Sequence, residues 1–101
     1  MSISAITNIA VSGMQAAAAQ LATAADNTAN LDSTGYQRRI TQASELASGG
    51  VETRTTTADG GVNLDHEMLN MIGAKLSFEA NASVFETGAD LWQVLSTIKR
   101  D

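Results

Sequence analysis

Apolar side chains recur at helical spacing near both ends of the chain, and a polar segment separates the two patterns. In the N-terminal part the spacing alternates between three and four residues, which predicts one face of a helix over residues 3–30. Ser2 is a suitable N-cap because its hydroxyl can accept a hydrogen bond from a free backbone amide of the first turn. The positions on this face are Ile3, Ile6, Ala10, Met14, Ala17, Leu21, Ala24 and Thr28.

A second and longer helix is predicted over residues 63–98. Asn63 can cap it, and Asp65 and Glu67 in the first turn suit the positive end of the helix dipole. Lys99 and Arg100 suit its negative end. The sequence therefore predicts two long helices at the two ends of the chain.

The second helix carries two apolar stripes rather than one. The first stripe, interrupted by Lys75, consists of Met68, Met71, Phe78, Ala82, Phe85, Ala89 and Trp92. The second consists of Leu69, Ile72, Leu76, Ala80, Val84, Leu91, Leu95 and Ile98. At about 100° per residue the stripes lie more than a quarter of a turn apart, so they need partners on two sides. One other long helix cannot cover both, and the second partner must come from another subunit.

This reasoning assigns residues to two kinds of contact. We expect the intrachain helix pair to use Ile6, Met14, Leu21, Phe78, Phe85 and Trp92. We expect contacts between subunits to use Ile72, Leu76, Leu91 and Leu95.

Residues 31–61 have a different character, because Thr, Val, Ile and Tyr are concentrated in two runs separated by Gly49-Gly50. The runs, residues 36–41 and 51–57, predict either a short β-hairpin or an irregular extended loop. The expected fold is a single mainly α domain over residues 1–101, in which this segment joins two long terminal helices into a hairpin.

Charge and composition narrow the functional classes. A formal net charge of −5 with only six Lys and Arg argues against nucleic acid as a partner. The chain has no cysteine, which removes thiol nucleophiles and thiolate metal sites. The N-terminal segment has no basic residue before its apolar part, so we predict neither a cleaved signal peptide nor a membrane span.

Candidate catalytic groups are few. The segment His66 to Asn70 has a histidine followed by a glutamate, but a zinc-protease helix needs a second histidine where Asn70 stands. The Gly49-Gly50 and Gly60-Gly61 pairs lack the lysine of a phosphate-binding loop. We therefore predict no enzyme activity, no metal or cofactor and no small-molecule substrate.

Two separated blocks resemble the bacterial flagellar rod and hook protein family. In the N-terminal block, "AVSGMQAAAAQLATAADNTANLDSTGYQRR", the matching positions are Ser12, Gly13, Met14, Asn27, Ala29, Asn30, Thr34, Gly35, Tyr36 and Arg38. In the C-terminal block they include Val62, Glu67, Met68, Ile72, Phe78, Glu79, Ala80, Asn81, Ala82, Val84, Thr87 and Ala89. Among its members, the chain most resembles the small proximal rod proteins, with a shorter middle segment and no proline.

The resemblance implies a structural subunit whose two terminal helices pair as an antiparallel coiled coil. Copies of the subunit would pack side by side through these helices and polymerise into a helical tube. Its partners would be copies of itself, related flagellar axial proteins and the flagellar export apparatus, and its location would be the periplasmic rod of the basal body. It also implies a functional turn made by Asn27, Asn30, Thr34, Gly35 and Tyr36, and a C-terminal motif that includes Glu79 and Asn81.

Physical chemistry gives the turn residues specific expectations. The side chains of Asn27 and Asn30 can bond backbone groups where the first helix ends, and Gly35 can adopt a positive φ. We expect the ring of Tyr36 to lie on the helix pair with its hydroxyl in solvent.

A different class of function remains open, a small soluble adaptor or export-related protein that forms a closed helical bundle.

Overall fold

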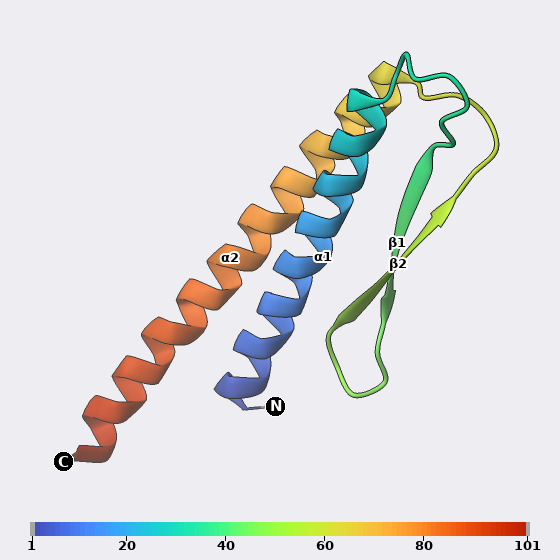
Figure 1. Cartoon of the computed structure of the whole chain (residues 1–101). Coiled ribbons are helices and arrows are strands. Elements are labelled where there is room, and N and C mark those ends of the chain that lie inside the picture. Colours follow the sequence, from blue (N-terminus) through green and yellow to red (C-terminus); the bar gives the residue numbers. More distant parts are fainter. Residues whose placement is uncertain (1, 101) are drawn as a thin grey trace.

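The computed structural model describes residues 2–100, and the side chains of residues 2–98. It has four elements: α1 (Ile3–Ala29), β1 (Arg39–Glu45), β2 (Val51–Thr57) and α2 (Leu64–Arg100). The predicted fold class is confirmed, because two long helices pair side by side and an antiparallel β-hairpin connects them (Figure 1). The molecule is elongated, with extents of 66 × 24 × 14 Å.

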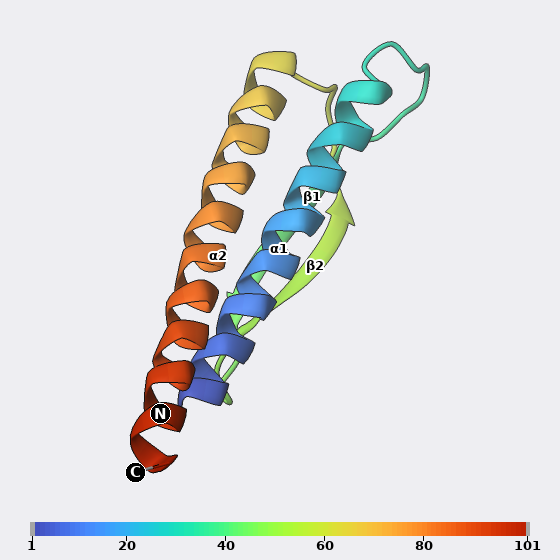
Figure 2. The ribbon, with the colours of Figure 1, turned by 90° about the vertical axis from the view of Figure 1, so that its left-hand side faces the viewer.

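The two helices run antiparallel, and two close contacts fix their register. Gly13 of α1 faces Asn81 of α2, and Gly88 of α2 faces Thr7 of α1. At this register Trp92 lies at the level of Ile3, the first residue of α1. Residues 93–100 of α2 therefore extend beyond α1, by about 12 Å at 1.5 Å per residue (Figures 1 and 2).

The helix ends have the caps that the sequence predicts. Ser2 Oγ accepts a hydrogen bond from Ala5 N at 3.1 Å, and Asn63 Oδ1 accepts one from His66 N at 3.2 Å. At the C-terminal end of α1, Asn30 Nδ2 donates to Asp26 O at 2.8 Å. The predicted contribution of Lys99 and Arg100 side chains at the end of α2 lies outside the described side chains.

Small residues fill the contact between the helices. Ala10, Ala17 and Ala24 on α1 are 1 %, 3 % and 2 % exposed, and Ala74 on α2 is 2 % exposed. On α2, Gly88 is also buried, two heptads after Ala74. Side chains of this size let two helices approach closely, and the seven-residue spacing keeps them on one line along the seam.

Large side chains lie opposite these small ones. The register brings Phe85 to the level of Ala10 and Phe78 to the level of Ala17. The two phenylalanines are still 40 % and 44 % exposed, because a pair of helices covers only one side of each ring. The core is thus a thin line of small residues flanked by partly exposed large ones.

The β-hairpin lies along α1, on the side away from α2 (Figure 1). Its register pairs Arg39 with Thr57 at one end and Glu45 with Val51 at the other. Of the two structures that the sequence left open for residues 31–61, the segment adopts the hairpin. The first strand spans Arg39–Glu45, whereas the predicted run covered residues 36–41; residues 36–38 form part of the connection from α1.

Two glycines at the tip of the hairpin allow it to approach α1. Gly49 and Gly50 have φ angles of +94° and +93°, which disfavour residues with a side chain. A Cβ atom on Gly50 would lie 3.0 Å from Ser12 Oγ, and one on Gly49 would lie 3.3 Å from Ile9 Cδ1. The backbone of the tip therefore lies directly on the helix.

Within the described residues, neither helix has a stretch apolar enough to cross a membrane. In the same part of the chain, the His, Asp and Glu side chains form no group of three that could hold a metal ion.

The register makes a prediction about the glycines of α2. A Cβ on Gly88 would lie 2.7 Å from Thr7 Cγ2, whereas a Cβ on Gly73 would meet nothing within 4 Å. Gly73→Ala should stabilise the protein by up to about 1 kcal/mol through helix propensity. Gly88→Ala should instead destabilise it by about 1 kcal/mol or more, because overpacking outweighs the same gain.

Urea denaturation of the dilute protein measures both changes. The double variant Thr7→Ser/Gly88→Ala removes the clashing methyl group and should recover most of the loss. Equal stabilisation by the two glycine substitutions would contradict the antiparallel register.

Candidate functional site

Asn27 joins α1 to the first strand. Its side chain is 1 % exposed; Nδ2 donates to Arg39 O at 2.8 Å, and Oδ1 accepts from Arg39 N at 2.8 Å. The amide group therefore bonds Arg39 as a neighbouring strand would. It satisfies backbone groups on the edge of β1 that faces away from β2.

Tyr36 completes this arrangement. Its hydroxyl donates to Asn27 Oδ1 at 2.8 Å, so the expectation of a hydroxyl in solvent is wrong. Gly35 has the expected positive φ, at +78°, which turns the chain back toward the helix. Asn30 bonds backbone as expected and also accepts from Ser33 Oγ at 3.1 Å, while Thr34 is exposed.

An ion pair connects the same region to α2. Arg38 Nε donates to Glu67 Oε1 at 2.7 Å, with the side chains 20 % and 1 % exposed. A buried carboxylate is costly unless it is paired, so this contact fixes the start of α2 against the connection from α1. We call Asn27, Tyr36, Arg38, Arg39 and Glu67 the polar node.

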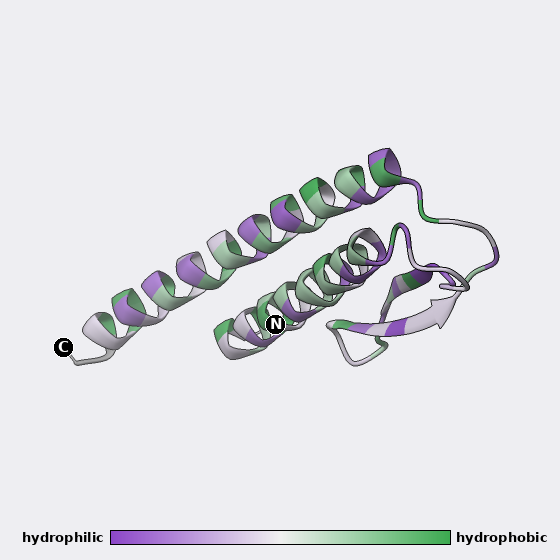
Figure 3. Ribbon diagram, turned by 45° about the horizontal axis from the view of Figure 1, so that its top comes forward, coloured by the Kyte–Doolittle hydropathy of each residue, from purple (hydrophilic) through white to green (hydrophobic). Residues whose placement is uncertain are grey.

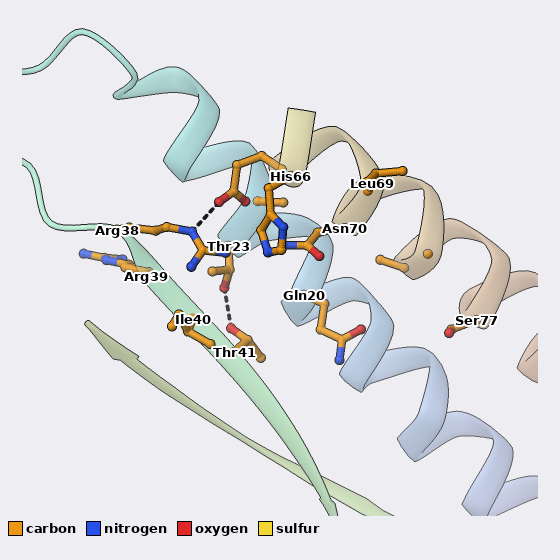
Figure 4. Close-up of a pocket in the computed structure, with 14 residues that line it drawn as sticks. Gln20, Thr23, Arg38, Arg39, Ile40, Thr41, His66, Leu69, Asn70 and Ser77 are labelled. Carbon is orange, nitrogen blue, oxygen red and sulfur yellow. Dashed lines mark hydrogen bonds and ion pairs between the residues drawn. The ribbon is translucent and has the colours of Figure 1, made fainter. Parts of the chain in front are cut away.

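A groove of about 520 Å³ opens beside the polar node, between β1, α1 and α2 (Figure 4). Uncharged polar groups such as Gln20, Thr23, Asn70 and Ser77 form much of its lining. Thr23 and Thr41 share a hydrogen bond between their hydroxyls across the groove. His66 lies at its edge and is exposed. Of the charged residues that line the groove, Arg38 and Glu67 bond each other, and Arg39 lies 3.8 Å from Asp26.

Exposed large apolar residues recur along most of the described length of α2. In Figure 3, hydrophobic and hydrophilic residues alternate along this helix. The residues expected in contacts between subunits, Ile72, Leu76, Leu91 and Leu95, are 54 %, 60 %, 49 % and 49 % exposed. They are accessible to a neighbouring molecule, and none is buried by this chain.

The residues expected within the helix pair lie beside the seam rather than on it. Ile6 and Met14 are partly buried. The others keep between 40 % and 61 % of their surface, and Trp92 is the most exposed of Leu21, Phe78, Phe85 and Trp92. Of the C-terminal motif residues, Asn81 faces Gly13 across the seam, and Glu79 is exposed and lies 3.9 Å from Lys75 Nζ.

Sequence reasoning missed the polar part of the buried line on α2. Glu67, Ala74, Asn81 and Gly88 recur every seven residues, and two are polar and two are small. Glu67, Ala74 and Gly88 are buried, and Asn81, which is partly buried, faces Gly13 of α1. A search for apolar stripes does not select such positions. The seven-residue spacing is visible in the sequence and could have indicated this line of residues. Nothing in the sequence indicated that Glu67 pairs with Arg38.

Comparison with known proteins agrees with this architecture. Residues 8–37 match the family "Flagella basal body rod protein", and residues 60–98 match "Flagellar basal body rod FlgEFG protein C-terminal". The chain is 30 % identical over 89 residues to the flagellar hook protein FlgE of Caulobacter vibrioides. The alignment covers 88 % of this chain and 15 % of that protein, so the chain corresponds to a small part of the hook protein.

The described residues form an elongated helix pair with exposed apolar stripes. The two family matches cover the two helices and together more than half of the chain. The chain belongs to the flagellar basal-body rod and hook family.

The polar node predicts a localised effect of Asn27→Ala. The substitution leaves Arg39 N–H and C=O without partners and should cost on the order of 2 kcal/mol. Hydrogen exchange of the Arg39 amide should accelerate. Asn30→Ala, the matched control, should cost less than about 1 kcal/mol and leave that amide protected. Equal effects of the two substitutions would show that Asn27 does not hold the strand.

The buried ion pair makes a second prediction. Arg38→Met leaves the Glu67 carboxylate buried and unpaired, and should destabilise the protein by about 3 kcal/mol. The double variant Arg38→Met/Glu67→Leu should recover most of that loss in chemical denaturation, because no charge remains buried. As a control, Arg39→Met removes only an exposed 3.8 Å contact with Asp26 and should cost less than about 1 kcal/mol. A double variant as unstable as Arg38→Met would contradict this account.

Proposed function

We propose that this chain is a non-enzymatic subunit of the flagellar rod that polymerises through its terminal helices into a helical tube. The family membership supports an axial structural role. The finer proposal depends on one observation, the large apolar side chains that α2 exposes on more than one side.

The exposed surface is large relative to the protein. The stripe formed by Leu69, Ile72 and Leu76 is 54 % to 67 % exposed, and it lies away from the seam with α1. A soluble monomer seldom exposes contiguous apolar surface of this kind, which marks interaction sites. A second copy or a related subunit would cover this stripe and gain the free energy of burying it.

The shape supports open rather than closed association. Heterologous contacts between unlike surfaces give a filament when the rotation between subunits does not close. The described part of the chain is long and thin, and exposed apolar residues recur from Leu64 to Ile98 along α2. Lateral packing of such subunits would produce the wall of a tube.

Export and location follow from the same proposal. A chain without cysteine can pass unfolded through an oxidising compartment without forming disulfides. The subunit would leave the cytoplasm through the flagellar export apparatus and assemble with related axial proteins in the periplasmic rod. Its function then needs neither a cofactor nor a small-molecule substrate.

A closed helical bundle is the second candidate, and the exposed stripes of α2 also favour it. An antiparallel dimer would give four helices and bury one stripe from each copy. Sedimentation over a concentration series separates the two proposals. A tube subunit should show open-ended growth, whereas a dimer that never enlarges would favour the closed adaptor.

The stripe assignment predicts the effect of Leu91→Asp. Because Leu91 is 49 % exposed, the substitution should leave monomer helicity nearly unchanged by circular dichroism. It should raise the concentration needed for association, seen by light scattering, at least tenfold, because a charge replaces a buried contact. Leu46→Asp, at a 40 % exposed position on the hairpin loop, controls for a general gain in solubility. Parallel loss of helicity and association would count against the assignment.

A further inference from the structure

The hydrogen bonds of the hairpin divide the residues of β1 into two sets. Leu46 N donates to Gly50 O at 3.0 Å, and Ala58 N donates to Arg38 O at 2.7 Å. Because bonded and non-bonded pairs alternate along an antiparallel ladder, the even-numbered residues of β1 bond β2. The odd-numbered residues therefore direct their backbone N–H and C=O groups away from β2; they are Arg39, Thr41, Ala43 and Glu45.

Asn27 shows what these outward groups accept. Its side-chain amide donates to Arg39 O and accepts from Arg39 N, each at 2.8 Å, so it occupies the first outward position as a neighbouring strand would. Within the described residues, the outward groups of Thr41, Ala43 and Glu45 have no such partner, and Ala43 and Glu45 are exposed. We call the outward backbone groups of these three residues the free edge of β1.

The free edge of β1 lacks the features that protect an edge strand. β1 contains no proline and no lysine, and its register with β2 continues without a bulge. The outer edge of β2 is instead bonded to α1 at the tip of the hairpin, where Ser12 Oγ accepts from Val51 N at 3.1 Å. The free edge of β1 is therefore a template on which another extended chain can pair.

The groove of about 520 Å³ lies beside this edge, since Ile40 and Thr41 line it. Much of its lining on α1 and α2 is uncharged and polar, including the side chains of Gln20, Thr23, Asn70 and Ser77 (Figure 4). Gly73 also lines the groove, and a Cβ atom built there would meet nothing within 4 Å. The groove thus has space for a side chain of an added strand.

The arginines beside the groove already have partners. Arg38 bonds Glu67, and Arg39 Nη1 lies 3.8 Å from Asp26 Oδ2. A charged side chain placed in the groove would lose hydration without gaining a free opposite charge. The groove therefore favours a segment with uncharged side chains such as Thr, Ser and Val.

We propose that the free edge of β1 binds an extended, uncharged segment of a partner polypeptide, which adds a third strand to the hairpin beside the groove. Main-chain hydrogen bonds to Thr41 and Ala43 hold the segment, and the lining of the groove disfavours charged side chains. The inference does not rest on the proposed polymerisation, because the contact is made by backbone groups of the hairpin and not by the apolar stripes of α2.

The experiment compares two proline variants of the full chain. Ala43 and Thr53 are register partners at opposite edges of the hairpin, and both direct their N–H groups outward. Neither Ala43→Pro nor Thr53→Pro therefore removes a hydrogen bond between the strands. Circular dichroism and the exchange protection of the Gln42 and Arg54 amides check that the hairpin is intact.

The probe is a fluorescent, end-capped peptide of alternating Thr and Val residues, as long as β1. Adding it should slow hydrogen exchange of the Thr41 and Ala43 amides, whereas the Arg39 amide, already bonded to Asn27, should not change. By fluorescence anisotropy, Ala43→Pro should weaken peptide binding at least about fivefold, because the edge loses a donor and gains a bulky ring. Thr53→Pro should bind like the unmodified chain.

A second peptide, with Glu in place of Val, tests the preference for uncharged side chains. It should bind at least about fivefold more weakly than the Thr and Val peptide, because its carboxylates lose hydration in the groove. Equal binding of the two peptides would remove the groove from the contact and overturn that part of the inference.

Three further results would overturn the inference. One is exchange of the Thr41 and Ala43 amides that does not respond to millimolar peptide, and another is equal weakening by the two prolines. The third is protection of these amides without peptide that disappears on dilution, which would show that a second copy occupies the edge. Failure of the chain to polymerise would bear only on the proposed function, since peptide binding does not require association of copies.

Discussion

Close packing of small side chains between α1 and α2 is the constraint on which the rest of the structure depends. Ala10, Ala17, Ala24 and Ala74 fill the seam, with Gly88 near one end of it. Alanine and glycine each bury little apolar area, so close van der Waals contacts between the two helices stabilise the pair, rather than a thick hydrophobic core. The large apolar residues are left on the flanks, partly exposed and able to contact other molecules.

The β-hairpin is attached by a different kind of interaction. Its strands are mostly exposed and carry few apolar residues, so hydrophobic burial cannot hold it. Hydrogen bonds do so instead: Ser12 Oγ accepts from Val51 N at 3.1 Å, and Asn27 bonds both backbone groups of Arg39. Polar attachment is directional, which fixes the orientation of the hairpin on α1 while leaving the outer surface of α2 uncovered.

The family motif at the end of α1 therefore has a structural explanation. Asn27, Gly35 and Tyr36 are the residues that return the chain to the helix and begin the hairpin, and Arg38 connects this return to Glu67 of α2. Asn27 and Tyr36 lie in the N-terminal family match and Glu67 in the C-terminal one, and Arg38, directly after the N-terminal match, links the two. The junction holds the two helices in a fixed arrangement, because rotation of one helix would displace its exposed stripes.

The sequence alone determined the two helices, their caps and the doubled apolar pattern of α2, because periodicity and capping are local properties. It also indicated the family, through motifs that are contiguous in the chain. Only the tertiary structure decided which side of α2 faces α1, since Glu67 and Asn81 carry no apolar signal and Arg38 finds Glu67 across 29 positions of sequence. The solvent exposure of Trp92 depends likewise on the helix register. The hydrogen bond from the Tyr36 hydroxyl to Asn27 depends on the path of the connection after α1. Contacts between distant segments set both.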